Sequence, residues 1–187
     1  VVFTLGTGAT TVNADEVDSP DNGSAIDLTL QAGALTSETL TVTGDAEIRI
    51  NELSTDVVAT NLTGDLDINA AANRGTAAED ALNVTAGTGR TTITGATDTT
   101  VKVDADLTAS DGSVNASSAE LVVNGSAGTV DVENLSADLN AQTFGGTLIV
   151  DVDVPTDAAA DTAEIEIITG SGATTIAGTD FTADETD

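Results

Sequence analysis

The chain has 187 residues and a formal net charge of −28, from 4 Lys and Arg against 32 Asp and Glu, with no His. Cys, Met, Trp and Tyr are also missing, which excludes thiolate and imidazole nucleophiles, His or Cys metal sites and disulfides. So acidic a surface repels nucleic acid, and three Phe offer little for base stacking. We therefore expect no enzyme, no nucleic-acid partner and, without an apolar run of about 20 residues, no membrane insertion.

Along the chain, apolar and polar residues alternate with a period of two, which predicts short β-strands separated by Gly, Asn, Asp, Ser and Thr turns. Many of the strands follow one another at about eight to ten residues, as in all-β folds. The predicted strands are 40–42, 48–50, 66–68, 82–84, 101–103, 121–123, 130–132, 148–150 and 165–167. The inward positions should form an aliphatic core from Leu40, Val42, Ile48, Ile50, Leu66, Ile68, Leu121, Val123, Val130, Val132, Leu148 and Val150.

The sequence also matches itself at an interval of about 82 residues. Residues 37–44 resemble 118–125, residues 48–54 resemble 130–136, and residues 82–93 resemble 165–176, with a third copy of that last element at 3–12. We therefore interpret 1–12 as the end of a preceding unit, 13–95 as repeat unit 1 and 96–178 as repeat unit 2. Residues 179–187 form an acidic tail or the start of a next unit.

Two architectures fit short strands at this density. A parallel β-solenoid stacks its coils around a thin core, which suits a chain whose core must be built from Val, Ile, Leu and Ala. Tandem β-sandwich modules of about 82 residues are the alternative, but such modules usually pack large aromatic residues between their sheets. Only Phe144 is placed to do so. The all-β solenoid is therefore the preferred prediction.

A Gly-x-Gly-x-x-Thr turn recurs as Gly87-Thr-Gly-Arg-Thr-Thr-Ile93 and Gly170-Ser-Gly-Ala-Thr-Thr-Ile176. It resembles a degenerate form of the calcium-binding turn of repeats-in-toxin (RTX) proteins. The rest of each unit is similar to bacterial surface-layer and large secreted repeat proteins. The resemblance implies an acidic, secreted chain that folds outside the cell with Ca²⁺. The Asp that binds Ca²⁺ in that family corresponds here to Thr10, Thr91 and Thr174, so these turns lack the metal-binding carboxylate.

Calcium could still bind elsewhere, because hard cations take several oxygen ligands and this chain is rich in them. One candidate cluster comprises Asp15, Asp18, Asp21 and Asn22, and a second comprises Asp151 and Asp153. Pairs such as Asp65 and Asp67 lie on one side of a strand, where they repel each other unless a cation or solvent intervenes. The alternative is that these acids are solvated surface groups that keep the chain soluble.

These observations favour an extracellular structural protein at the cell surface that forms a homopolymer with copies of itself. We expect a surface layer or matrix fibre, in which sheet edges pair and divalent cations cancel the repulsion between acidic chains. The first alternative is a stalk or spacer of a large adhesin. The second is a pilus-like subunit joined by donor strands, with Val1–Val12 as the donated strand.

Overall fold

The computed structural model describes residues 2–5, 8–14, 28–31, 39–73, 81–105, 120–152 and 165–178. Within these residues every regular element is a strand. One sheet contains β1 (Val2–Thr4), β3 (Leu28–Gln31), β5 (Ile48–Leu53), β7 (Leu66–Ala70), β9 (Thr91–Thr94), β11 (Glu120–Asn124), β13 (Asp138–Asn140) and β15 (Ile167–Ile168). The other contains β2 (Thr10–Ala14), β4 (Leu40–Gly44), β6 (Val57–Val58), β8 (Leu82–Thr85), β10 (Thr100–Asp104), β12 (Thr129–Leu135), β14 (Thr147–Val152) and β16 (Thr174–Gly178). We call these the odd sheet and the even sheet.

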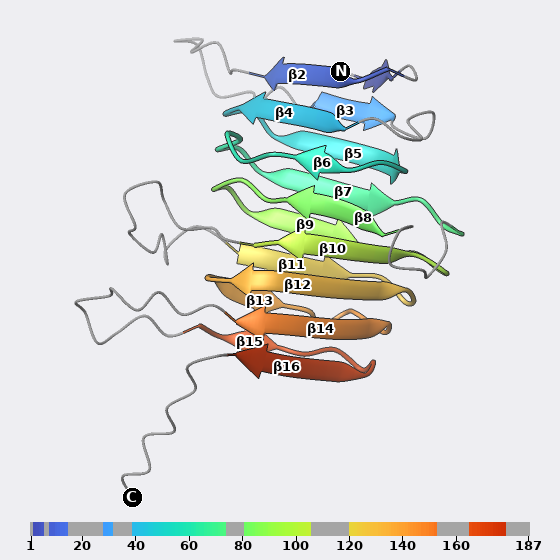
Figure 1. The fold of residues 1–187 in the computed structure, drawn as a ribbon, viewed down its shortest axis with the longest axis vertical. Helices are drawn as coiled ribbons and strands as arrows, with labels where there is room; N and C mark the ends of the chain where they lie inside the picture. The colour runs from blue at the N-terminus through green and yellow to red at the C-terminus, as the bar shows by residue number, and fades with distance from the viewer. Residues whose placement is uncertain are drawn as a thin grey trace, which may run out of the picture.

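The chain passes from the odd sheet to the even sheet and back, so that each coil adds one strand to each sheet (Figure 1). Neighbouring strands in both sheets are parallel; β5, for example, pairs with β3 and β7. Two continuous eight-stranded parallel sheets confirm the all-β prediction and form a solenoid-like stack. Sandwich modules are built from antiparallel sheets, so the described residues favour the solenoid over that alternative.

Coil length varies while the register is kept. Ile48 pairs with Leu66, 18 residues later, and Val130 pairs with Leu148 at the same interval. Two strands in each such coil agree with the spacing of about eight to ten residues that the sequence indicated. Other coils are longer; Thr91 pairs with Leu121, 30 residues later, and that interval includes residues outside the described ranges.

The core lies between the two sheets and follows the period of two. In β4 and β5 the first and third residues are buried, while the side chains between them are partly exposed. The twelve inward positions predicted from the sequence are all at most 1 % exposed, which confirms them as core. The strands are joined through corners, where Leu62 and Phe144 are also buried. Aliphatic side chains thus fill the interior along the length of the stack.

Segments that match in the sequence lie in different sheets. Residues 40–44 form β4 of the even sheet, whereas the matching residues 121–125 fall on β11 of the odd sheet and the corner after it. Likewise β5 matches β12, and β9 matches β16, always seven strands apart. Since each coil contributes two strands, the interval is three and a half coils and exchanges the two faces of the stack.

Local backbone geometry recurs at these matched positions. Gly44 and Gly125 have φ of 113° and 115°, and Glu52 and Asn134 have φ of 56° and 55°. Glu52 and Asn134 each lie where the register shifts, in β5 against β7 and in β12 against β14. A left-handed residue at a bulge redirects the strand toward the next corner, so the two matched strands end in the same way.

Glycine at the corners allows one coil to lie directly on the previous one. A Cβ atom on Gly89 would lie closer than 3.0 Å to the carbonyl oxygen of Gly64, one coil earlier, and a Cβ on Gly64 would meet the Ala46 carbonyl in the same way. Gly172 is similarly placed against Gly146. Neither Gly64 nor Gly89 has a left-handed backbone, so the close approach of two backbones is what requires glycine there.

We expect Gly89→Ala to lower the free energy of unfolding by about 1–3 kcal/mol, because the added methyl group has no room against the preceding corner. The matched control is Gly8→Ala, since no atom lies within 4 Å of a Cβ at Gly8. Urea titration followed by circular dichroism measures both variants. Equal stability of the two would contradict this account of the corners.

Candidate functional site

The structure places few of the predicted calcium ligands. Asp15, Asp18, Asp21, Asn22 and Asp153 lie outside the described residues. Asp151 is exposed on β14, where its register partner is Ala177 of β16. In the part of the chain that the structure describes, no three acidic side chains converge to hold a metal ion. Calcium at these two clusters therefore remains a prediction.

Thr91, which corresponds to the metal-binding Asp of RTX turns, faces the core. Its side chain is 1 % exposed, and its register partners on the neighbouring strands are Leu66 and Leu121. The Thr91 hydroxyl group has no hydrogen-bond partner. This position in the middle of the stack is therefore a packing position, a placement that the turn motif alone did not reveal.

In the part of the chain that the structure describes, acidic side chains lie on the outer faces of both sheets and at the corners between strands, and the cations among them join adjacent coils. On the odd sheet, Arg49 lies 3.3 Å from Glu47 and 3.2 Å from Asp67, its register partner on the next strand. Arg90 lies 3.2 Å from Asp65. The sequence predicted repulsion between Asp65 and Asp67 unless a cation intervened; each of the two has its own arginine.

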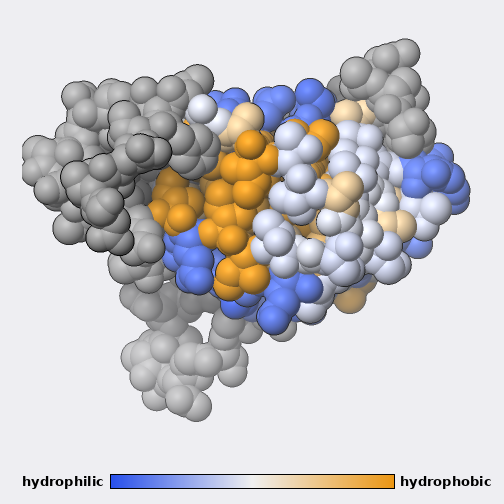
Figure 2. Space-filling view, turned by 90° about the horizontal axis from the view of Figure 1, so that it is seen from below, coloured by the Kyte–Doolittle hydropathy of each residue, from blue (hydrophilic) through white to orange (hydrophobic). Residues whose placement is uncertain are grey.

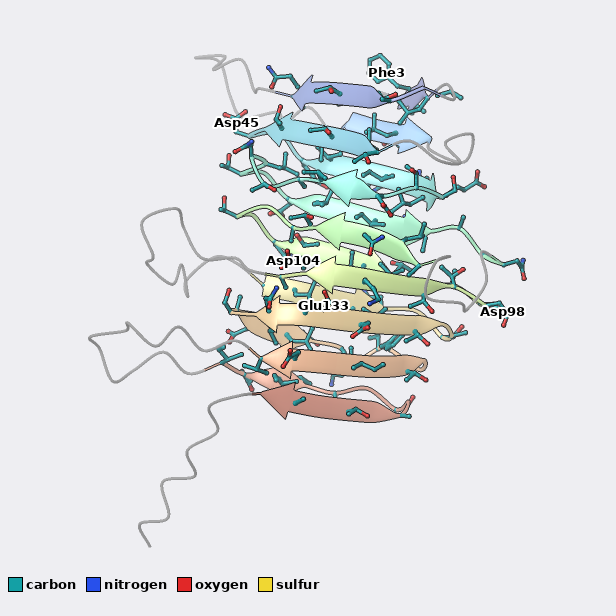
Figure 3. All side chains as sticks on the ribbon, viewed as in Figure 1. Phe3, Asp45, Asp98, Asp104 and Glu133 are labelled. Atoms are coloured by element: carbon teal, nitrogen blue, oxygen red, sulfur yellow. The ribbon has the colours of Figure 1, made fainter. Side chains whose placement is uncertain are left out.

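On the even sheet a single lysine lies among several acids. The Lys102 ammonium group is 3.9 Å from Asp131 and 3.4 Å from Glu133 on the next strand. Asp104 pairs in register with Glu133. The side-chain amide of Asn134 donates a hydrogen bond of 3.1 Å to the carboxylate of Asp104. Figure 3 shows Asp104 and Glu133 close together on adjacent strands. Exposed pairs of this kind add little stability but offset like-charge repulsion between coils.

Hydrogen bonds made by Asn and Asp side chains also connect the coils. The amide of Asn69 on β7 donates to the side-chain oxygen of Asn51 on β5 at 2.9 Å. Asp56 accepts hydrogen bonds from the backbone and side-chain amides of Asn83, one coil later. The outer surface is thus tied together along the stack axis, in the same direction as the backbone hydrogen bonds.

The two ends of the stack differ in chemistry from its sides. β1 and β2 lie at one end and β15 and β16 at the other, and within the described residues no strand pairs with their outer edges. Large apolar side chains are exposed there: Val2 is 66 %, Phe3 51 %, Ile168 38 % and Ile176 44 % exposed. Figure 2 looks onto the β15–β16 end and shows an apolar band across it.

Comparison with known proteins adds no assignment: no family model, no curated protein and no solved structure matches this chain. Among the described residues, none forms a helix of the length and hydropathy needed to cross a membrane. The candidate functional surfaces of the described residues are the acidic outer faces and the open ends of the stack.

We expect Thr91→Val to raise the free energy of unfolding by about 1 kcal/mol, because it removes a buried, unpaired hydroxyl group while keeping the side-chain shape. Thr92→Val is the control, since Thr92 lies on the outward side of the same strand. Chemical denaturation of the three proteins measures the difference. If Thr91→Val destabilises the fold, the hydroxyl group has a role that packing does not explain.

Proposed function

We propose that this chain is a structural segment of an extracellular protein that self-assembles into a surface layer or matrix fibre at the cell surface. The observation that carries the proposal is the uninterrupted double stack of parallel strands, whose outermost strands have no described partner on their outer edges. An unpaired strand edge is a template for pairing with another chain. Coils that contact mainly their neighbours make a rod, which is a mechanical element.

The solenoid in this proposal consists of tandem units of about 82 residues. The recurrence of left-handed residues at Gly44 and Gly125, and at Glu52 and Asn134, supports it. Because a unit has seven strands and each coil has two, a strand of one unit lies in the odd sheet and the matching strand of the next unit lies in the even sheet. The two faces of the rod therefore carry the same sequence patterns in alternate units. Neighbouring rods would then meet similar surfaces from either side.

Divalent cations assist the assembly in this proposal. With a formal net charge of −28, two chains that lie side by side repel each other. Three of the four basic residues, Arg49, Arg90 and Lys102, already contact acidic residues of their own chain. Little positive charge is therefore left for a neighbouring rod. Ca²⁺ bound by carboxylates of two rods would lower the repulsion more effectively than monovalent salt, which only screens it.

The adhesin stalk remains an alternative, because a stiff rod would also serve as a spacer. The pilus-like alternative would use Val1–Val12 as a donated strand. Val2–Thr4 and Thr10–Ala14 form β1 and β2, which pair within the chain with β3 and β4. Donation would require these pairs to open first.

Electron microscopy of the purified chain tests the proposal, with millimolar Ca²⁺, with chelator and with NaCl at equal ionic strength. We expect ordered filaments or sheets with Ca²⁺ that dissolve on chelation, because bridging needs a divalent ion. Equal assembly in NaCl would contradict the bridging role of calcium but would still support self-assembly. A protein that stays monomeric at high concentration in all three conditions would favour the spacer.

A further inference from the structure

Three coils of the stack share one sequence pattern, in residues 3–12, 84–93 and 167–176. The middle copy comprises the second half of β8 and most of β9, and both strands are covered on both sides. β8 pairs with β6 and β10, and β9 pairs with β7 and β11. The other two copies form the ends, β1–β2 and β15–β16. In the middle of the stack, strands with this sequence therefore have a neighbouring strand on both sides. At each end, among the described residues, they have a neighbour on one side only.

Gly8 is the clearest sign that something covers the β1–β2 end. The matching glycines Gly89 and Gly172 are required because a Cβ would lie closer than 3.0 Å to a carbonyl oxygen of the preceding coil. Around Gly8 no atom lies within 4 Å of a Cβ, and its backbone is not left-handed. Neither space nor backbone conformation within the described chain requires glycine at this position, whereas a coil stacked upon it would.

The opposite end exposes side chains that are buried in the middle copy. Ile93 of β9 is completely buried, whereas Ile176, which matches it on β16, is 44 % exposed. Val150, the register partner of Ile176 on β14, is buried. Ile176 therefore points toward the core, and a further coil beyond β16 would bury it as β11 helps to bury Ile93.

Charge distinguishes the ends from the sides. Residues 1–14 contain no charged side chain, and residues 165–178 contain only Glu166, although the whole chain has 32 acids. Two copies approaching side by side bring acidic faces together, whereas two copies approaching end to end bring together strands that carry almost no charge. Repulsion between copies thus leaves end-to-end contact as the approach with the smallest electrostatic cost.

We propose that a second copy of this chain stacks on each end, with β1 and β2 of one copy pairing in parallel with β15 and β16 of the next. The two sheets then continue from copy to copy. The inference rests on the self-assembly proposed above and specifies its contact. Because the paired ends are different surfaces, the contact does not close and generates an open filament. Eight coils at a strand spacing of about 4.8 Å give a rise of about 38 Å per copy.

The corner glycines set the register. Gly89 lies on Gly64 where Thr91 pairs with Leu66, and Gly172 lies on Gly146 where Thr174 pairs with Leu148. Gly8 of one copy stacked in this way on Gly172 of the other places Thr11 beside Thr175. Both residues are exposed, and adjacent parallel strands place partner Cα atoms about 5 Å apart, within reach of a disulfide. The chain has no Cys, so Thr11→Cys with Thr175→Cys should yield a ladder of covalent oligomers on mild oxidation. The control pair, Thr11→Cys with Ala177→Cys, is shifted by two residues to about 8 Å and should not cross-link.

Gly8→Ala tests the same contact in a chain without cysteines. The variant should keep the circular dichroism spectrum and melting temperature of the parent, and its end-to-end association in sedimentation velocity should fall about tenfold or more, because the methyl group meets the stacked corner. Thr60→Ala, at an exposed corner in the middle of the stack, should associate as the parent does. Unchanged association of Gly8→Ala would overturn the proposed contact.

The outcomes separate this inference from the proposed function. Filaments or sheets without the Thr11–Thr175 cross-link overturn the end-to-end contact and leave the structural function standing. Cross-linked oligomers that remain short rods and never build a fibre or sheet support the contact and overturn the structural function. A chain that stays monomeric and does not cross-link overturns both the end-to-end contact and the structural function. The two ends would then be covered by a polypeptide other than a second copy of this chain.

Discussion

The direct stacking of one coil on the next is the constraint on which the rest of this structure depends. Parallel strands lie about 4.8 Å apart, so the corners that connect them must follow each other at the same distance. When two backbones approach each other this closely, no space is left for a side chain between them, as at Gly64 and Gly89. The glycines thus keep the strands in register, and the register keeps every inward residue above another inward residue.

A thin interior follows from this stacking. The two sheets are joined by short corners in several coils, such as 45–47 and 54–56, and the space between them is filled mainly by Val, Ile and Leu. Phe144 is the exception, and its ring lies at a corner where Cβ atoms on Gly95 and Gly146 would contact it. This aromatic side chain of the described core thus has room only because two neighbouring residues lack side chains, so a core poor in aromatic residues suits this architecture.

Charge and hydrogen bonding act in different directions in this molecule. Along the axis, backbone hydrogen bonds, amide ladders such as Asn51–Asn69 and ion pairs such as Arg49–Asp67 all connect successive coils. Across the axis, the outer faces carry an excess of acids. The stack is therefore cohesive along its length and repulsive at its sides, and a proposed assembly must extend the axis before it joins sides through cations.

Local patterns revealed much of the fold. Eight of the nine predicted runs lie within strands, because alternation with a period of two places one set of side chains inside. The two- and three-residue strands β6 and β13 were missed, since so few residues show no alternation. β9 and β16 were interpreted as parts of a turn because Gly-x-Gly precedes them. The ion pairs of Arg49 and Lys102 were missed because they join residues from different coils.

The sequence by itself determined that the chain is all β, which side chains face the core and which segments resemble each other. Only the tertiary structure decided which sheet each strand joins. Alternation distinguishes inside from outside, and both sheets face the same core, so the pattern of a strand is the same in either sheet. Matching segments such as β4 and β11 therefore lie on opposite faces, and the open coils at the two ends became visible only once the stack was assembled.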